Sequence, residues 1–217
     1  YFHLVGLVVG TVDGVVADAV LEASLPLGNA ELDADMIQLF DCTESLADTL
    51  IYGEPNTDGW VDDLGEIAES LAPAPSIGES IARSPDGADS DDAGLDFVVV
   101  STPTPGSHGD FSDDVMADTG GLPTTSCALS DDIKINEVLA NPEGTDTDQE
   151  WIELYNAGEE AVSLEGWRLE GGTSASSFRI DVTFESGVLL APYGFLLVGE
   201  SLVAGADVTT DLSLGNA

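Results

Sequence analysis

The sequence predicts an all-β fold, and three observations support this prediction. Short apolar segments recur along the 217 residues: an apolar strand is expected at Ile133, Ile135 and Val138, and a second, alternating strand contains Trp151, Ile152, Leu154 and Tyr155. Acidic stretches that contain glycine, proline or asparagine separate the segments, and these residues favour turns. The pair Gly166 and Trp167 opens a further strand.

The remaining elements follow from the same patterns. Strands are expected in apolar segments at residues 1–6, 34–42, 46–53, 80–84 and 96–101. One short helical turn is expected at residues 62–71, because Leu64, Ile67, Ala68 and Leu71 recur at helical spacing. Pro73 would end that turn.

The composition combines a globular core with extreme acidity. Apolar residues make up 43% of the chain, which argues against disorder. The 42 Asp and Glu against 4 Lys and Arg give a formal net charge of -38. Such a chain is repelled by phosphate backbones and anionic membranes, so we expect no nucleic-acid partner. No apolar run approaches the length of a membrane span, so we expect no direct membrane insertion. It suits seawater, a calcium-bearing extracellular space or a hypersaline cytoplasm.

Two sets of spaced residues resemble the lamin tail domain family. The opening pattern of its bacterial members is matched by Ile135-Asn136-Glu137, Asn141-Pro142, Gly144, Glu150-Trp151-Ile152-Glu153-Leu154, Asn156 and Gly166-Trp167. The closing pattern is matched by Gly78-Glu79-Ser80, Arg83, Pro85-Asp86-Gly87, Asp89, Asp91, Asp96-Phe97 and Pro103-Thr104-Pro105-Gly106. The resemblance implies an immunoglobulin-like β-sandwich from a bacterial, exported protein.

The closing pattern precedes the opening pattern, and two short repeats accompany this order. Phe195-Leu196-Leu197-Val198-Gly199 repeats residues 2–6, and residues 212–217 repeat residues 25–30. We therefore expect an excerpt from tandem copies: residues 1–107 are the later part of one module, residues 108–129 a linker, and residues 130–217 the earlier part of the next. The two halves are expected to pair as one circularly permuted sandwich, in which residues 1–6 and 195–199 compete for one strand position.

The two cysteines have several possible roles. Cys42 and Cys127 lack the spacing of a zinc site, and two ligands do not complete one. In a permuted sandwich they can meet as a disulfide, which would favour an extracellular or periplasmic location. Free thiols, or partners outside this stretch, are the alternatives.

Two acidic loops are candidate calcium sites. Asp86, Asp89 and Asp91 in one loop, and Asp146, Asp148 and Glu150 in the other, place carboxylates around glycine. Calcium takes six to eight oxygen ligands on a bendable loop, and calcium is the single candidate cofactor. Neither loop matches the EF-hand template, so solvated turn residues are the alternative interpretation.

The sequence does not predict an enzyme. His3 and His108 have no catalytic motif around them, and no GxSxG, HExxH or phosphate-binding loop occurs. Glu153 is expected to point outward from its strand and to support a backbone turn. Arg83 is expected to pair with a carboxylate of the Asp86 loop.

The aromatic residues Trp151, Tyr155 and Trp167 are expected in the core or on a sheet face, with a recognition surface as the alternative. The favoured function is a non-catalytic extracellular or cell-surface module that acts as a spacer, an adhesion domain or a protein-interaction domain in a tandem array. Its partner, a protein or a surface glycan, is not identified by the sequence. The alternatives are an accessory module that targets a secreted nuclease or phosphatase, with calcium shared between them, and a cytoplasmic protein of a halophile.

Overall fold

The computed structural model describes residues 33–108, 127–144, 148–174 and 176–215, together with two short strands nearer the start. The chain divides into two compact units, Tyr1–Glu31 and Leu32–Ala217. In the first unit, β1 (Thr11–Val12) and β2 (Val15–Val16) form an antiparallel pair. The strand expected at residues 1–6, and with it His3, lies outside the described residues.

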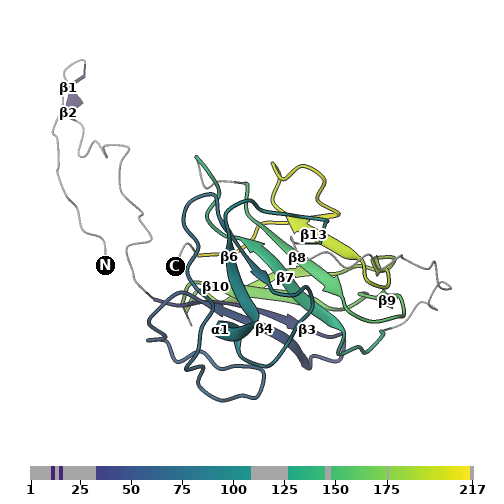
Figure 1. Cartoon of the computed structure of the whole chain (residues 1–217). Coiled ribbons are helices and arrows are strands. Elements are labelled where there is room, and N and C mark those ends of the chain that lie inside the picture. Colours follow the sequence, from purple (N-terminus) through teal and green to yellow (C-terminus); the bar gives the residue numbers. More distant parts are fainter. Residues whose placement is uncertain are drawn as a thin grey trace. The chain divides into compact units, whose positions relative to one another are not determined.

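The second unit contains two larger sheets (Figure 1). The first sheet has four strands in the order β11 (Arg179–Thr183), β10 (Arg168–Gly172), β3 (Asp35–Phe40) and β4 (Leu46–Tyr52). The second has six strands in the order β14 (Val208–Thr209), β13 (Phe195–Gly199), β8 (Trp151–Asn156), β7 (Ile133–Leu139), β5 (Ser80–Arg83) and β6 (Phe97–Val100). A small sheet pairs β9 (Val162–Ser163) with β12 (Leu189–Leu190), and helix α1 spans Ala93–Asp96.

The two larger sheets bury one continuous apolar core. Ile37 and Leu50 of the four-stranded sheet belong to the same cluster of buried side chains as Ile135, Leu154 and Val198 of the six-stranded sheet. Removing these side chains from water is the main favourable term in folding, so the core holds the sheets together. The prediction of an all-β sandwich is confirmed.

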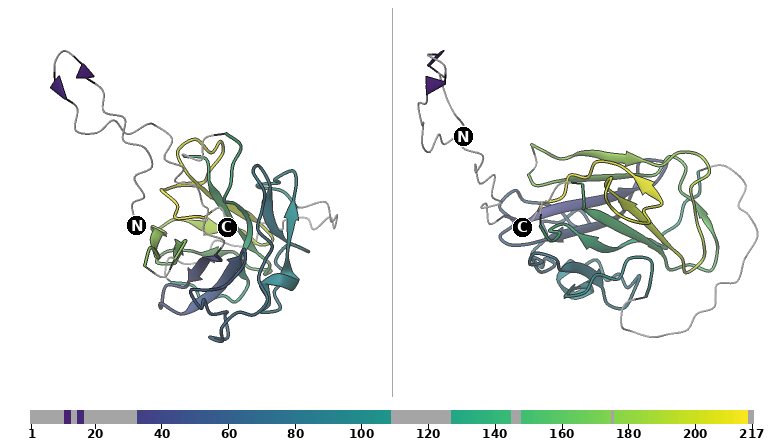
Figure 2. Two further views of the ribbon diagram at one scale, coloured as in Figure 1. Left: turned by 90° about the vertical axis from the view of Figure 1, so that its left-hand side faces the viewer. Right: turned by 90° about the horizontal axis from the view of Figure 1, so that it is seen from above.

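Both sheets combine strands from the two segments that the sequence analysis separated. Strand β3 pairs antiparallel with β10, with Leu39 opposite Leu169, and β5 pairs antiparallel with β7, with Ala82 opposite Glu137. Figure 2 shows the purple strand β3 beside green strands from later in the chain. The expected pairing of the two segments is therefore confirmed, and β13 fills the strand position beside β8.

The helical turn expected at residues 62–71 is wrong. Val61 and Ile67 form an isolated β-bridge there, and the side chain of Leu64 is 70% exposed instead of packed. The Asp62 carboxylate accepts hydrogen bonds from the backbone N–H of Leu64 and of Glu66, at 3.0 Å each. Such local bonds give the backbone an alternative to a helix.

The helix that does form was missed by the sequence analysis, which placed an Asp-rich loop there. Asp92 caps α1, since its side chain accepts from the N–H groups of Gly94 and Leu95. Within the part of the chain that the structure describes, no helix has the length and apolar character needed to cross a bilayer.

Candidate functional site

The motif residues on β7 and β8 form a buried polar network that holds two turns. The Glu137 carboxylate accepts hydrogen bonds from the Ser80 hydroxyl (2.5 Å), from the Thr104 backbone N–H (3.0 Å) and from the Thr104 hydroxyl (2.9 Å). The Glu153 carboxylate accepts from the Gly106 N–H (2.5 Å). Together they anchor the Pro103-Thr104-Pro105-Gly106 turn to the sheet.

Asn136 connects this network to the second turn. Its side-chain oxygen accepts from the Gly87 N–H (3.0 Å), and its amide nitrogen donates to Asp86 and to Glu153, at 3.1 Å each. The pairing of β7 with β8 shifts register between Ile135 and Glu137, so Asn136 is an extra residue in its strand. This β-bulge brings Glu137 opposite Glu153 and turns the three polar side chains toward the turns.

Glu153 therefore has the role expected for it but not the orientation. Its predicted support of a backbone turn is confirmed by the bond from Gly106, whereas its predicted outward position is wrong, because Glu153 is 0% exposed. Burial raises the pKa of Glu153 to about 7, opposed by the hydrogen bonds from Gly106 and Asn136 and reinforced by the charges of Glu137 and Asp86. The carboxylate acts here as an acceptor for backbone groups.

A second buried cluster surrounds Arg83 on β5. Its guanidinium lies 2.6 Å from the Asp48 carboxylate on β4, 3.3 Å from Asp96 and 3.5 Å from Asp89. It also donates to the backbone oxygens of Ile135 (2.8 Å) and Ala88 (2.6 Å). The expected pairing of Arg83 with the Asp86 loop is confirmed through Asp89, but the shorter contact is with Asp48, which belongs to the opposite sheet.

Asp48 bridges the two sheets. Its second carboxylate oxygen accepts from the backbone N–H of Ile135 on β7, at 2.6 Å. Burial raises the pKa of Asp48, while the charges of Arg83 and Lys134 and the bond from Ile135 act in the opposite direction. A buried carboxylate is tolerated only when it is paired and hydrogen-bonded in this way.

The structure gathers a third carboxylate at the same place. Among the described residues, Asp48, Asp63 and Asp89 form the one group of acidic side chains close enough to hold a metal ion, with oxygens within 4.8 Å of one another. The Lys134 ammonium lies 2.5 Å from Asp89, and the Arg83 guanidinium contacts Asp48 and Asp89. Two side-chain cations thus already neutralise part of this group.

Asp63 differs from the other two carboxylates. One of its oxygens is buried and has no hydrogen-bond partner. Burial raises the pKa of Asp63 to about 7, with the charges of Asp48 and Asp89 adding to the effect and a hydrogen bond with Thr49 and the charge of Lys134 opposing it. The Asp63 carboxyl therefore releases its proton near neutral pH, and not near pH 4 as an exposed Asp does.

Of the six residues predicted to bind calcium, Asp89 alone belongs to this group. Asp86 contacts Asn136 and His108, and Asp91 has a left-handed backbone with φ of 58°. Asp148 accepts a bond from Leu202 through its carbonyl, Glu150 is buried beside Glu200, and Asp146 lies outside the described residues. Calcium binding by the two loops stays a prediction, which calorimetry with calcium tests.

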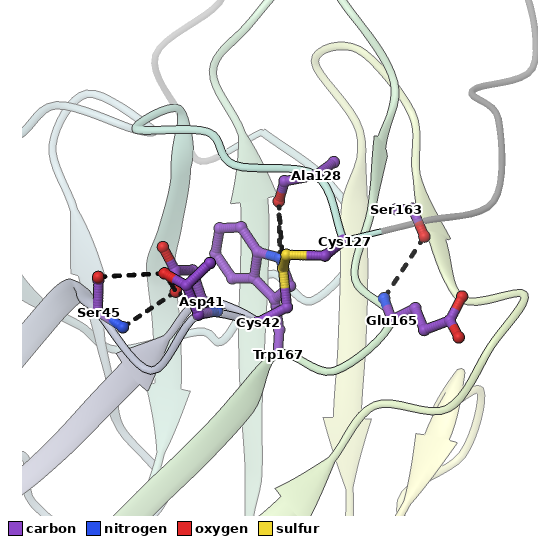
Figure 3. Close-up of a disulfide and its surroundings, with 9 residues drawn as sticks. Asp41, Cys42, Ser45, Cys127, Ala128, Ser163, Glu165 and Trp167 are labelled. Atoms are coloured by element: carbon purple, nitrogen blue, oxygen red, sulfur yellow. Dashed lines mark hydrogen bonds between the residues drawn. A yellow bond between two sulfur atoms is a disulfide. The ribbon is translucent and has the colours of Figure 1, made fainter.

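Cys42 and Cys127 form a disulfide across the two segments (Figure 3). Their Cα atoms are 5.6 Å apart. Asp41 fixes the turn that carries Cys42 by accepting from the N–H of Thr43 (2.7 Å) and of Ser45 (3.0 Å). Beside Cys127, the indole N–H of the buried Trp167 donates to the Ala128 carbonyl (3.0 Å), so the core anchors the Cys127 end of the bridge.

The three aromatic residues of the motif segment are buried, and His108 packs beside them on the sheet. Trp151, Tyr155 and Trp167 are buried, as predicted. His108 contacts the Asp86 carboxylate at 2.9 Å and packs edge-on against Phe195, with ring centroids 5.0 Å apart. It therefore fixes the start of the predicted linker onto the sheet.

The residues that the sequence analysis missed are Asp48, Asp63, Lys134 and Asn136. Asp48 gave a signal, since it is a lone charge in an apolar strand segment and such a charge is buried only with a partner. Lys134 gave a weaker one, because its strand also contains Glu137. Asn136 belongs to the quoted motif, but its function depends on the bulge, which has no pattern of its own in the sequence. Asp63 lies in a loop and gave no signal.

Comparison with known proteins supports the resemblance for one part of the chain. The family model of the Lamin Tail Domain matches residues 128–216. No curated protein matches the chain, and no solved structure matches it. Residues 128–216, which supply β7 to β14 of the immunoglobulin-like sandwich, are therefore similar to the lamin tail domain family.

Proposed function

We propose that this chain is a non-catalytic β-sandwich module of an exported protein, which serves as a spacer or a protein-interaction domain. The observation that carries the proposal is the use of the motif residues. The polar atoms of the motif side chains form hydrogen bonds with the backbone and side chains of two turns; these side chains are Glu137, Glu153 and Asn136. Arg83 and Asp48 contact each other and so join the two sheets. These contacts favour a rigid scaffold.

The position of the last described residues supports a tandem arrangement of such modules. Gly215 packs so closely on Asp35, where β3 begins, that a Cβ atom on it would clash with the Asp35 carboxylate. The Tyr52 hydroxyl donates to the Gly215 carbonyl at 2.8 Å. The repeat of this segment, residues 25–30, precedes β3 in the sequence, separated from it by residues 31–34. A chain cut from tandem modules would carry such a repeat, because one copy of the segment would end the later module and the other would precede β3 of the earlier one.

The disulfide favours an extracellular location. Disulfides persist in oxidising compartments and are rare in the cytosol. A bridge between residues 85 positions apart restricts the unfolded chain strongly, which suits a module that must stay folded outside the cell.

The proposal is tested by thiol titration and unfolding. Denatured protein from an oxidising compartment should show no free thiol, and reduction should lower the free energy of unfolding by at most about 4–5 kcal/mol, the chain-entropy value for such a loop. Cys42→Ser combined with Cys127→Ser should reproduce the reduced protein and no longer respond to reductant. Two free thiols in the untreated protein, or equal stability of the reduced and oxidised forms, would contradict an exported, disulfide-clamped module.

A further inference from the structure

Strand β6 is an edge of the six-stranded sheet, and among the residues that the structure describes no further strand pairs with its outer side. Residues 97–107 contain no charged side chain, although the chain has 42 acidic residues. Val98 is 40% exposed and Val99 is 36% exposed. Natural edge strands are normally blocked by charges, by proline or by a covering loop, because their free backbone groups pair with other strands. Figure 1 shows β6 on the outer side of its sheet.

The hydrogen-bond pattern shows which backbone groups of β6 face outward. The Ser84 N–H donates to the Asp96 carbonyl at 2.9 Å, and Arg83 lies opposite Phe97. In an antiparallel pair, opposite residues alternate between hydrogen-bonded and non-hydrogen-bonded pairs. Because Ser84 and Asp96 are hydrogen-bonded, Arg83 and Phe97 form a non-hydrogen-bonded pair, and the next pair along β6, Ala82 with Val98, is hydrogen-bonded again. Val98 and Val100 therefore bond to β5, whereas the N–H and carbonyl of Val99 point away from the sheet.

A cavity of about 210 Å³ opens where β6 begins. Phe97 and Asp96 line it, and its walls contain the carboxylates of Asp62, Glu69, Asp89, Asp91, Asp92 and Asp96. Arg83 is the one cation of its wall, and three carboxylates already pair with it. The end of the uncharged edge is thus strongly negative.

We propose that the β6 edge binds an extended segment of a partner protein that carries apolar residues followed by a lysine or arginine. The segment adds a strand through the N–H and carbonyl of Val99, packs its apolar side chains beside Val98, and places its basic side chain at the carboxylate-lined cavity. Backbone bonds supply affinity in this mode of recognition, and side-chain sites supply specificity. The proposal rests on the interaction role proposed above and names its site and partner class.

Charge decides between this occupant and a second copy of the chain. Pairing β6 with β6 of another molecule would bring together two chains of net charge -38. A basic segment is instead attracted, and opposite charges speed association at low salt.

The test uses three synthetic peptides and measures binding to the intact protein by fluorescence anisotropy. The first peptide alternates valine with threonine and ends in two lysines, the second replaces the lysines by glutamates, and the third carries N-methyl groups on alternate backbone nitrogens. The lysine peptide should bind at least about tenfold more tightly than the other two, and salt should weaken its binding. Equal binding of all three would overturn the proposal.

Protein variants locate the site. Val99→Pro removes the outward N–H and should weaken binding of the lysine peptide about tenfold. Ile180→Thr, which changes an exposed apolar side chain on β11, at the edge of the other sheet, should change this binding little. The double variant Asp91→Asn and Glu69→Gln should weaken binding of the lysine peptide and reduce the dependence of this binding on salt. Unchanged binding of the lysine peptide to the Val99→Pro variant would overturn the proposal. It would also be overturned if the unmodified protein forms dimers in sedimentation and Val99→Pro abolishes them, because the β6 edge would then bind a second copy of the chain. If Val99→Pro does not fold, the N-methylated peptide makes the same test. None of these outcomes depends on the disulfide, so the module proposal is tested separately.

Discussion

At the scale of single residues, buried charges join the two sheets. Arg83 contacts carboxylates from β4, from α1 and from the loop between β5 and α1, and its side chain is almost entirely buried. Removing one partner of a buried ion pair leaves an unpaired charge in the interior, which costs far more than losing a pair at the surface.

Arg83→Met is therefore expected to lower the free energy of unfolding by about 3–5 kcal/mol, because Asp48 and Asp96 lose their cation. Glu44→Gln is the control: its side chain is 82% exposed and lies 3.9 Å from Arg168, and the expected loss is below about 1 kcal/mol. Urea unfolding at neutral pH measures both. Equal losses in the two variants would show that the Arg83 cluster is not a special contribution to stability.

The Asp63 carboxyl predicts a dependence of stability on pH. Its pKa is raised to about 7 in the folded protein by burial and by Asp48 and Asp89, above the ordinary value of 3.8 that applies when unfolded. The unfolded chain therefore releases this proton first as pH rises. Its contribution to stability is fully present below about pH 4 and is lost as pH rises through about 7.

Asp63→Asn should consequently stabilise the protein at pH 8, by about 1–2 kcal/mol after allowance for solvent screening, and do so much less at pH 5. Glu66→Gln removes the same charge from an exposed position of the same loop and serves as the control. Urea midpoints across pH 5–8 give the comparison. A gain that is equal at both pH values would mean that Asp63 titrates normally.

At the scale of elements, strands were predictable and the short irregular elements were not. Alternating apolar residues placed β7 and β8 within a residue or two of their observed bounds. The spacing of Leu64, Ile67 and Ala68 also fits a helix, but the Asp62 side chain bonds to the local backbone and a loop forms. A three-residue coincidence of spacing cannot outweigh such local hydrogen bonds.

The turn at Pro85-Asp86-Gly87 depends on glycine for two reasons. Gly87 has φ of 68°, and a Cβ atom on it would lie 2.9 Å from Ala157 and from the Tyr155 ring. Gly65 has φ of 79° with nothing within 4 Å, so it shares the conformation but not the contact.

Gly65→Ala should thus cost about 1–2 kcal/mol of stability for the backbone conformation alone. Gly87→Ala should cost about 1–3 kcal/mol more, because the new methyl group also overpacks against β8. Thermal and urea unfolding of the two variants separate the cost of the backbone conformation from the cost of the steric contact. If both variants lose the same amount, the close packing of the turn is not what requires glycine.

At the scale of the whole molecule, the cations are used internally and the acidic excess remains. All four Lys and Arg contact carboxylates within the sandwich. The surface is left with mutually repelling carboxylates, and repulsion of this kind destabilises a compact state.

Raising NaCl from about 0.01 M to about 0.15 M should therefore stabilise the protein by on the order of 1 kcal/mol, because the screening length falls from about 30 Å to about 8 Å. Urea midpoints at each concentration measure the change, and sorbitol at equal osmolality is the uncharged control. If the urea midpoint rises equally in sorbitol, the stabilisation comes from exclusion of solute from the protein surface and not from screening of charge.

The sequence by itself determined the strands, the acidic excess and the motif residues, since these follow from residue type and local periodicity. It also indicated, through the reversed order of the family patterns, that residues before and after 108–129 complete each other. The tertiary structure alone decided how the motif acts. The bulge at Asn136 sets which side chains meet, and Asp48 and Arg83 come from strands of different sheets. Contacts between residues distant in sequence arise from packing of the whole core, which no local pattern encodes.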